Sequence, residues 1–159
     1  MVLAGCGRIA FDPIGATPDD GGTTDGPGDG AGPDGTPSAC LASSAYTTKA
    51  GLANRYREGV ALVSWSVARS MCKADGADLW IPQSALELST WSGDWIGVTD
   101  EIVEDVWVTV EGVPATFLPW EPAQPDGGPS ENCARSTGVF LEDRACSDAR
   151  DFVCECVVN

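Results

Sequence analysis

Apolar residues recur at helical spacing in two short stretches in the middle of the chain. The first is residues 64–76, with Ser64 as a candidate N-cap and Gly76 as a stop signal. Its apolar face carries Trp65, Ala68, Met71 and Cys72. The second begins at Ser84, where the order Ser-Ala-Leu-Glu has the spacing of a capping box. The pattern therefore predicts two amphipathic helices.

From Asp94 onward the pattern changes to short apolar runs rich in Trp, Val and Thr. Glycine, proline and acidic residues separate the runs, as expected for strands joined by turns. The runs are residues 94–98, 106–110, 115–120, 138–142 and 151–158. Two helices followed by a series of short strands predict an α+β domain with a mixed or antiparallel sheet.

Composition divides the chain of 159 residues into two parts. All six tryptophans lie between Trp65 and Trp120, whereas the first 39 residues hold 10 of the 19 glycines and 5 of the 11 prolines. A segment of that composition buries too little apolar surface to offset the entropy lost on folding. We therefore expect residues 7–39 to be a flexible linker rich in Gly, Pro and Asp, and residues 40–159 to form one domain.

The net charge of −15 argues against nucleic acid as a partner, because phosphate binding relies on clustered Lys and Arg. The chain contains no histidine, which removes the commonest general base and the commonest transition-metal ligand. We also find no nucleophile beside a recognisable base and no phosphate-binding glycine loop, so we expect no enzyme activity. Carboxylate and carbonyl oxygens remain, and these suit calcium.

Seven cysteines in so short a chain indicate an oxidising compartment, since such a density is uncommon where thiols are kept reduced. Cys6 stands apart from the others, so we expect three disulfides and one thiol with a separate role. The cysteines of the dense region are Cys40, Cys72, Cys133, Cys146, Cys154 and Cys156. By themselves, six cysteines allow fifteen connectivities.

Leu3-Ala4-Gly5-Cys6 resembles a bacterial lipobox, in which small residues admit the signal peptidase and the cysteine becomes lipidated. Because only a few residues precede Cys6, we interpret residues 1–6 as a truncated lipoprotein signal with its lipobox. A lipidated Cys6 would hold the domain outside the cytoplasm, at a bacterial outer membrane or cell surface, through the lipid anchor only. The alternative is a chance match of four residues.

Several short motifs in the second part of the chain follow the order of one known family. Trp95-Ile96-Gly97-Val98 matches the WIGL strand signature of that family. Other matches are Trp120, the Gln-Pro-Asp of residues 124–126, and the cysteine frame at residues 131–133, 146 and 152–155. Residues 40–159 therefore resemble a C-type lectin or C-type-lectin-like domain. The resemblance implies two helices packed on short antiparallel strands, a long calcium loop and three disulfides.

The same resemblance implies how the cysteines pair and how the loop is shaped. It pairs the cysteines as Cys72–Cys154 and Cys133–Cys146, which leaves Cys40–Cys156. It also implies a cis peptide bond before Pro125, which turns the two flanking side chains toward one point.

The resemblance further implies a calcium site in the loop and a sugar site built on the calcium. The matching metal ligands are Gln124, Asp126, Glu131, Glu142 and Asp143. The residues expected to contact a carbohydrate are Gln124, Asp126, Glu131 and Glu142. Calcium takes six to eight oxygen ligands, and these positions supply carboxylates and an amide oxygen. The alternative is a solvated acidic loop.

One position departs from the pattern of the family. Where the family has Trp-Asn-Asp, this chain has Leu141-Glu142-Asp143. An asparagine can ligate calcium through its oxygen and still donate an N–H to a sugar, whereas an ionised glutamate has no donor. We therefore expect calcium binding to be retained better than sugar binding.

Two further groups of charged residues remain. The first is acidic and is either an accessory calcium site or, as we prefer, an exposed polar turn; it comprises Asp100, Glu101, Glu104 and Asp105. The second we expect to be surface charges that partly offset the acids, namely Arg135, Arg144 and Arg150.

Together these features predict a surface-anchored, calcium-dependent carbohydrate-binding module that is not an enzyme. Its partner would be a glycan. The alternative is the same fold used for protein–protein recognition or adhesion without sugar, with a surface protein as ligand.

Overall fold

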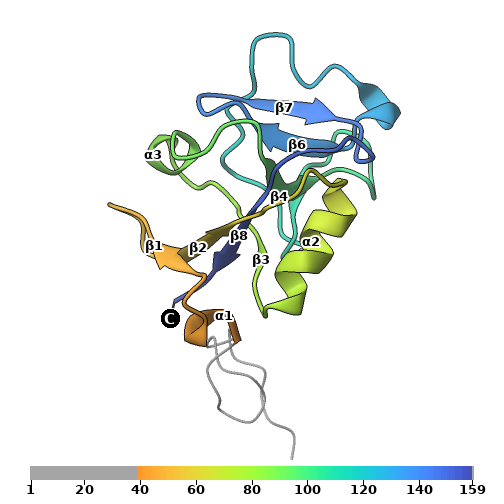
Figure 1. Ribbon diagram of the computed structural model, residues 1–159. Helices are drawn as coiled ribbons and strands as arrows, with labels where there is room; N and C mark the ends of the chain where they lie inside the picture. Colours follow the sequence, from red (N-terminus) through yellow and green to blue (C-terminus); the bar gives the residue numbers. More distant parts are fainter. Residues whose placement is uncertain (1–38, 159) are drawn as a thin grey trace, which may run out of the picture.

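The computed structural model describes residues 39–158, which form two four-stranded antiparallel sheets with one longer helix beside them (Figure 1). The predicted α+β class is confirmed. The predictions for residues 1–6 and for the linker, apart from Ala39, lie outside the described residues. Within residues 39–158, we find no helix that is both long enough and apolar enough to cross a membrane.

The first sheet brings the two ends of the domain together. Its strands run in the order β1 (Thr47–Thr48), β2 (Arg55–Glu58), β8 (Val153–Cys156) and β3 (Asp78–Leu79). β8 lies inside this sheet and buries every one of its residues. The hydrophobic pattern does not reveal β2, because its neighbours in the chain are polar and Tyr56 is its only fully buried residue.

The second sheet carries the long loop, which we define as residues 119–131. Its strands run in the order β5 (Val108–Thr109), β4 (Trp95–Thr99), β6 (Cys133–Ser136) and β7 (Leu141–Arg144). β4 is buried along its whole length. Figure 1 shows β7 at the opposite end of the domain from α1 (Ala39–Ala42) and the C-terminus.

Three predicted strands differ from the structure. The run 106–110 forms a strand only at Val108–Thr109. Residues 115–120 form no strand, and Trp120 makes only a single bridge with Leu141. The reason is that Pro119 has no N–H to donate to a ladder. The run 138–142 begins as a turn and becomes a strand only at Leu141.

Both predicted helices form, although the second is short. α2 (Trp65–Ala74) follows Ser64, which has the extended backbone of an N-cap, and stops before Gly76, whose φ is 73°. α3 (Ala85–Leu88) is a single turn, and the Ser84 hydroxyl caps it by accepting a backbone hydrogen bond at 3.2 Å. The long loop contains one further short helix, η1 (Gly128–Ser130).

Three disulfides brace these elements, and their pairing agrees with the prediction. The Cα–Cα distances are 5.9, 5.2 and 5.1 Å for Cys40–Cys156, Cys72–Cys154 and Cys133–Cys146. The first two fasten α1 and α2 to β8, and the third joins β6 to the segment that follows β7.

The two sheets meet at Gly97. A Cβ atom at this position would lie 2.7 Å from the carbonyl oxygen of Leu79, so only glycine lets β3 and β4 pack at this distance. Trp80, the residue after β3, packs edge-on against Trp91 with ring centroids 4.8 Å apart. The contact at Gly97 therefore joins the first sheet, which holds both ends of the domain, to the second sheet, which carries the long loop.

Candidate functional site

The start of the long loop is fastened to β7 by backbone hydrogen bonds. The N–H of Leu141 donates to the carbonyl of Pro119, and the N–H of Glu121 donates to the carbonyl of Leu141, both at 2.9 Å. The ring of Trp120 packs edge-on against Trp107, with centroids 4.7 Å apart. Leu141 is fully buried, so it fills an apolar position where the family has a tryptophan.

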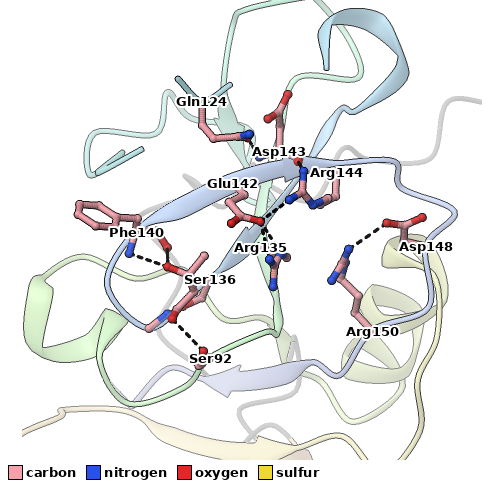
Figure 2. Close-up of polar contacts among 12 residues, drawn as sticks. Ser92, Gln124, Arg135, Ser136, Phe140, Glu142, Asp143, Arg144, Asp148 and Arg150 are labelled. Atoms are coloured by element: carbon pink, nitrogen blue, oxygen red, sulfur yellow. Dashed lines mark hydrogen bonds and ion pairs between the residues drawn. The ribbon is translucent and has the colours of Figure 1, made fainter. Parts of the chain in front are cut away.

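The side chain of Asp143 organises the turn that follows Pro125. Asp143 is 1% exposed, and its two carboxylate oxygens accept hydrogen bonds from the N–H groups of Asp126 (3.1 Å) and Gly127 (2.9 Å). Its own N–H donates to Gln124 Oε1 at 3.1 Å (Figure 2). The Gln124–Pro125 peptide bond is cis, as the resemblance implies. A buried strand residue therefore positions the polar side chains of the loop.

Three of the predicted metal ligands converge beside this turn. One carboxylate oxygen from each of Asp126, Glu131 and Asp143 lies within 4.8 Å of the other two. Gln124 lies next to them, since its Nε2 donates to Asp126 Oδ1 at 2.7 Å. Carboxylates with a neighbouring amide oxygen are the hard donors that calcium prefers, so this donor set fits the ion. We call Asp126, Glu131 and Asp143 the loop carboxylates.

Glu142, the remaining predicted ligand, is not one of the loop carboxylates and is held by two arginines. Its Oε2 accepts hydrogen bonds from Arg135 Nε at 2.9 Å and from Arg144 Nη2 at 2.6 Å (Figure 2). The exposed fractions of the Arg135 and Arg144 side chains are 20% and 27%. The prediction is right that these two arginines offset acids, but they are half-buried rather than surface charges, because they neutralise a buried carboxylate. Arg150 pairs with Asp148 at 3.0 Å.

The surroundings of Glu142 keep it ionised. Burial by itself would raise the pKa of Glu142, but hydrogen bonds with Glu121 and Arg135 and the charges of Arg135 and Arg144 hold it below its usual value. The same hydrogen bond raises the pKa of Glu121. Glu142 could ligate a metal only by giving up ion pairs with the cations of the protein itself.

A second acidic group, Asp100 with Glu104 and Asp105, contains a buried member. Their carboxylate oxygens lie within 4.8 Å of one another. Asp100 is only 3% exposed; its Oδ2 accepts the N–H of Asp105 at 2.9 Å, whereas its buried Oδ1 accepts no hydrogen bond from the described residues. Asn132 directly follows Glu131, one of the loop carboxylates. Its Oδ1 is also buried and accepts no hydrogen bond from the described residues. An unpaired buried carboxylate oxygen carries a desolvation penalty that a cation would relieve, so this group also fits calcium.

The exposed turn predicted for Asp100, Glu101, Glu104 and Asp105 is right for the three glutamate and aspartate residues after Asp100 and wrong for Asp100 itself. Burial raises the pKa of Asp100, and the charges of Asp105 and Asp143 raise it further. The backbone hydrogen bond from Asp105 lowers this pKa but does not cancel the rise. The charge of Asp143, one of the loop carboxylates, therefore acts on Asp100 of the second group. The signal in the sequence was the position of Asp100 directly after β4, whose residues are all buried.

The fold, the disulfides and the long loop define a C-type lectin domain. Residues 61–156 match the family model described as the lectin C-type domain, and the chain belongs to this family. Members of the family are typically binding domains rather than enzymes. Three disulfides are consistent with this class and indicate an extracellular, oxidising setting.

Curated relatives are animal proteins. The chain is 31% identical over 102 residues to C-type lectin domain family 3 member A of Bos taurus, covering 55% of this chain and 52% of that protein. It is 32% identical over 134 residues to a tetranectin-like protein of Carcharhinus perezii, covering 75% of this chain and 77% of that protein. The chain thus spans about half the length of the first of these relatives.

Similar solved structures establish the fold alone, because their sequence identities are low. The mouse scavenger receptor C-type lectin carbohydrate-recognition domain has a TM-score of 0.65 at 22% identity, covering 74% of this chain and 98% of that one. A calcium-independent type II antifreeze protein has a TM-score of 0.63 at 20% identity, covering 71% and 92%. The fold therefore does not by itself determine whether calcium binds.

Proposed function

We propose that this domain is an extracellular, calcium-dependent carbohydrate-binding module with its ligand at the long loop. The observation that carries the proposal is the convergence of the loop carboxylates beside Gln124. Bound calcium would neutralise these carboxylates and offer coordination positions to the hydroxyl oxygens of a sugar.

The side chains of the loop would have distinct roles toward the ligand. Gln124 carries the amide donor of the group, and its Nε2 would exchange Asp126 for a sugar hydroxyl. Asp126 and Glu131 would accept hydrogen bonds from other hydroxyls. Glu142 has no free donor, and it would join the metal ligands only by giving up its ion pairs with Arg135 and Arg144.

Calorimetric titration of the full chain with calcium chloride tests the metal site. We expect the wild type to bind and Glu131→Gln to bind about tenfold or more weakly, because one carboxylate of the site has lost its charge. Glu111→Gln, which changes an exposed acid outside both groups, is the matched control and should bind like the wild type. A wild-type chain that binds no calcium contradicts the proposed function.

Binding to a glycan array, measured in calcium and again in chelator, tests the ligand class. We expect glycan signals in calcium that disappear in chelator and in Glu131→Gln. Signals that persist unchanged in chelator would rule out a sugar held through calcium.

A protein ligand at the same end of the domain is the second candidate, and one observation favours it. Ile102, Val103 and Val106 are 85%, 55% and 50% exposed around the second acidic group. Exposed aliphatic side chains gain more from packing against a protein than from contact with a polar sugar. Calcium binding without any glycan signal would favour this candidate.

We also propose, on the sequence alone, that Cys6 is lipidated and anchors the protein to a membrane. The curated relatives named above are animal proteins and lend no support to a bacterial lipoprotein. Mass spectrometry of the protein from its native membrane tests this proposal, and an unmodified Cys6 contradicts it.

A further inference from the structure

The guanidinium of Arg144 lies between two of the predicted calcium ligands. Its Nη2 is 2.6 Å from Glu142 Oε2, and its Nη1 is 3.5 Å from Glu131 Oε2. The same Nη1 donates to the carbonyl oxygen of Asp143 at 3.1 Å. Because an arginine stays protonated in proteins, a permanent positive charge touches a carboxylate that calcium would use.

Arg144 also connects the long loop to the sheet. It is the last residue of β7 and lies opposite Cys133 in β6, so the ladder holds its backbone in place. Glu131 is the last residue of the long loop. The planar guanidinium presents several N–H groups at once, which lets one side chain contact the strand and the loop together. The loop end is therefore held at β7 by a cation that belongs to the protein.

We propose that Arg144 is a resident cation of the long loop, which keeps the loop folded without calcium and lowers the calcium affinity of the loop carboxylates. The second part rests on the proposed function; the first does not. Calcium must either share Glu131 with the guanidinium or displace the guanidinium from Glu131. In both cases the repulsion between two cations, or the loss of the Arg144 ion pairs, opposes binding.

Calorimetry with calcium chloride tests the affinity. The titrated proteins are full-length chains with Glu104→Gln, so that an ion at the second acidic group does not contribute heat. The doubly charged calcium ion and the singly charged guanidinium would lie roughly 5 Å apart in water. Their repulsion predicts that Arg144→Gln binds calcium about tenfold more tightly. Arg144→Lys keeps the charge and should stay near the reference. Lys73→Gln removes a cation paired with Asp78 on α2 and β3, and so measures the effect of net charge alone.

Hydrogen exchange in chelator, followed by mass spectrometry, tests the ordering of the loop. We expect residues 119–131 to exchange faster in Arg144→Gln than in the wild type, while β4 stays equally protected. Equal exchange in the loop overturns this part of the proposal. If β4 also exchanges faster, the variant is destabilised globally and Arg144→Lys decides: restored protection supports the resident cation, and unrestored protection overturns it.

The outcomes separate this inference from the proposed function. If the reference chain binds calcium and Arg144→Gln changes the affinity by less than about twofold, or no more than Lys73→Gln does, the affinity part is wrong and the proposed function stands. If neither protein binds calcium, the proposed function fails and so does the affinity part. Hydrogen exchange still decides whether Arg144 orders the loop.

Discussion

Two buried aspartates show how position changes the chemistry of one residue type. Asp143 is 1% exposed, yet both of its oxygens accept backbone hydrogen bonds. Asp100 is 3% exposed and keeps one oxygen unpaired among the described residues. Because an unpaired buried carboxylate is unfavourable when charged, Asp100 is the residue that would benefit more from a proton or a metal ion.

Asp100→Asn tests this need for a cation. In chelator we expect the variant to be more stable than the wild type, because an amide buries no charge. In calcium the order should reverse, since calcium at about 100 times its dissociation constant stabilises the wild type by about 2.7 kcal/mol. Thermal unfolding of both proteins in chelator and in calcium measures whether the order of their stabilities reverses. Glu111→Gln serves as the control. A variant less stable than the wild type in chelator contradicts the prediction.

Asp94 should make the stability of the domain depend on pH. Asp94 is 8% exposed, and burial, followed by the charges of Asp151 and Glu58, raises its pKa from 3.8 to about 6. The folded protein therefore holds this proton more tightly than the unfolded chain does. The resulting stability is complete below about pH 4 and is lost as the pH rises through about 6.

Asp94→Asn removes that dependence. We expect the variant to match the wild type near pH 4 and to exceed its unfolding free energy at pH 7 by up to about 3 kcal/mol. Denaturant unfolding across this range measures the difference between the two proteins. A difference that does not grow with pH would show that Asp94 is not the responsible group.

At the scale of elements, β8 is where distant parts of the chain are joined. It pairs with β2 and β3, and it carries Cys154 and Cys156, whose partners are 82 and 116 residues away in sequence. Cys133–Cys146 closes a loop with a sequence separation of only 13. Cys40–Cys156 therefore fastens the two ends of the domain, Cys72–Cys154 fastens α2 to β8, and the short bridge fastens the sheet that carries the site.

Replacing both cysteines of a bridge by serine should lower stability by an amount that follows the loop each bridge closes. While Cys72–Cys154 remains, Cys40–Cys156 in effect closes only the 40–72 segment, which corresponds to about 4 kcal/mol. Cys133–Cys146 closes a shorter loop and corresponds to about 3 kcal/mol. Urea unfolding of the two double variants measures both values. A larger loss for the Cys133–Cys146 pair contradicts the loop-length argument.

At the scale of the whole molecule, the long loop and the two ends of residues 39–158 lie at opposite ends of the domain. β7 is at one end, and α1 and the C-terminus are at the other (Figure 1). A segment attached through α1 would therefore leave the long loop free to meet a ligand.

The charge of the whole chain predicts a response to salt. With 24 acidic and 9 basic residues, repulsion among the acids outweighs the attraction within ion pairs. In chelator, we expect the unfolding temperature to rise as sodium chloride increases from about 20 to about 500 mM, because salt screens this repulsion. Thermal unfolding monitored by tryptophan fluorescence measures the trend. A falling temperature would mean that the ion pairs, including those of Glu142, contribute more than the repulsion.

The sequence alone determined the class of fold, both helices, and, through the family resemblance, the disulfide pairing and the cis bond before Pro125. The helices have local signals, namely helical spacing and caps. The disulfide pairing and the cis bond follow only from the resemblance, since six cysteines by themselves allow fifteen connectivities. It also indicated Asp126, Glu131 and Asp143 as members of one site, because they lie in matched motifs.

Only the tertiary structure decided which acids are available to a metal and which are already neutralised. The pairing of β6 with β7 brings Arg135 opposite Glu142, and the end of β7 brings Arg144 to Glu131. The burial of Asp100 likewise depends on how the turn after β4 packs. A charge in the sequence has no partner until the fold supplies one, and the partner determines whether that carboxylate can bind calcium.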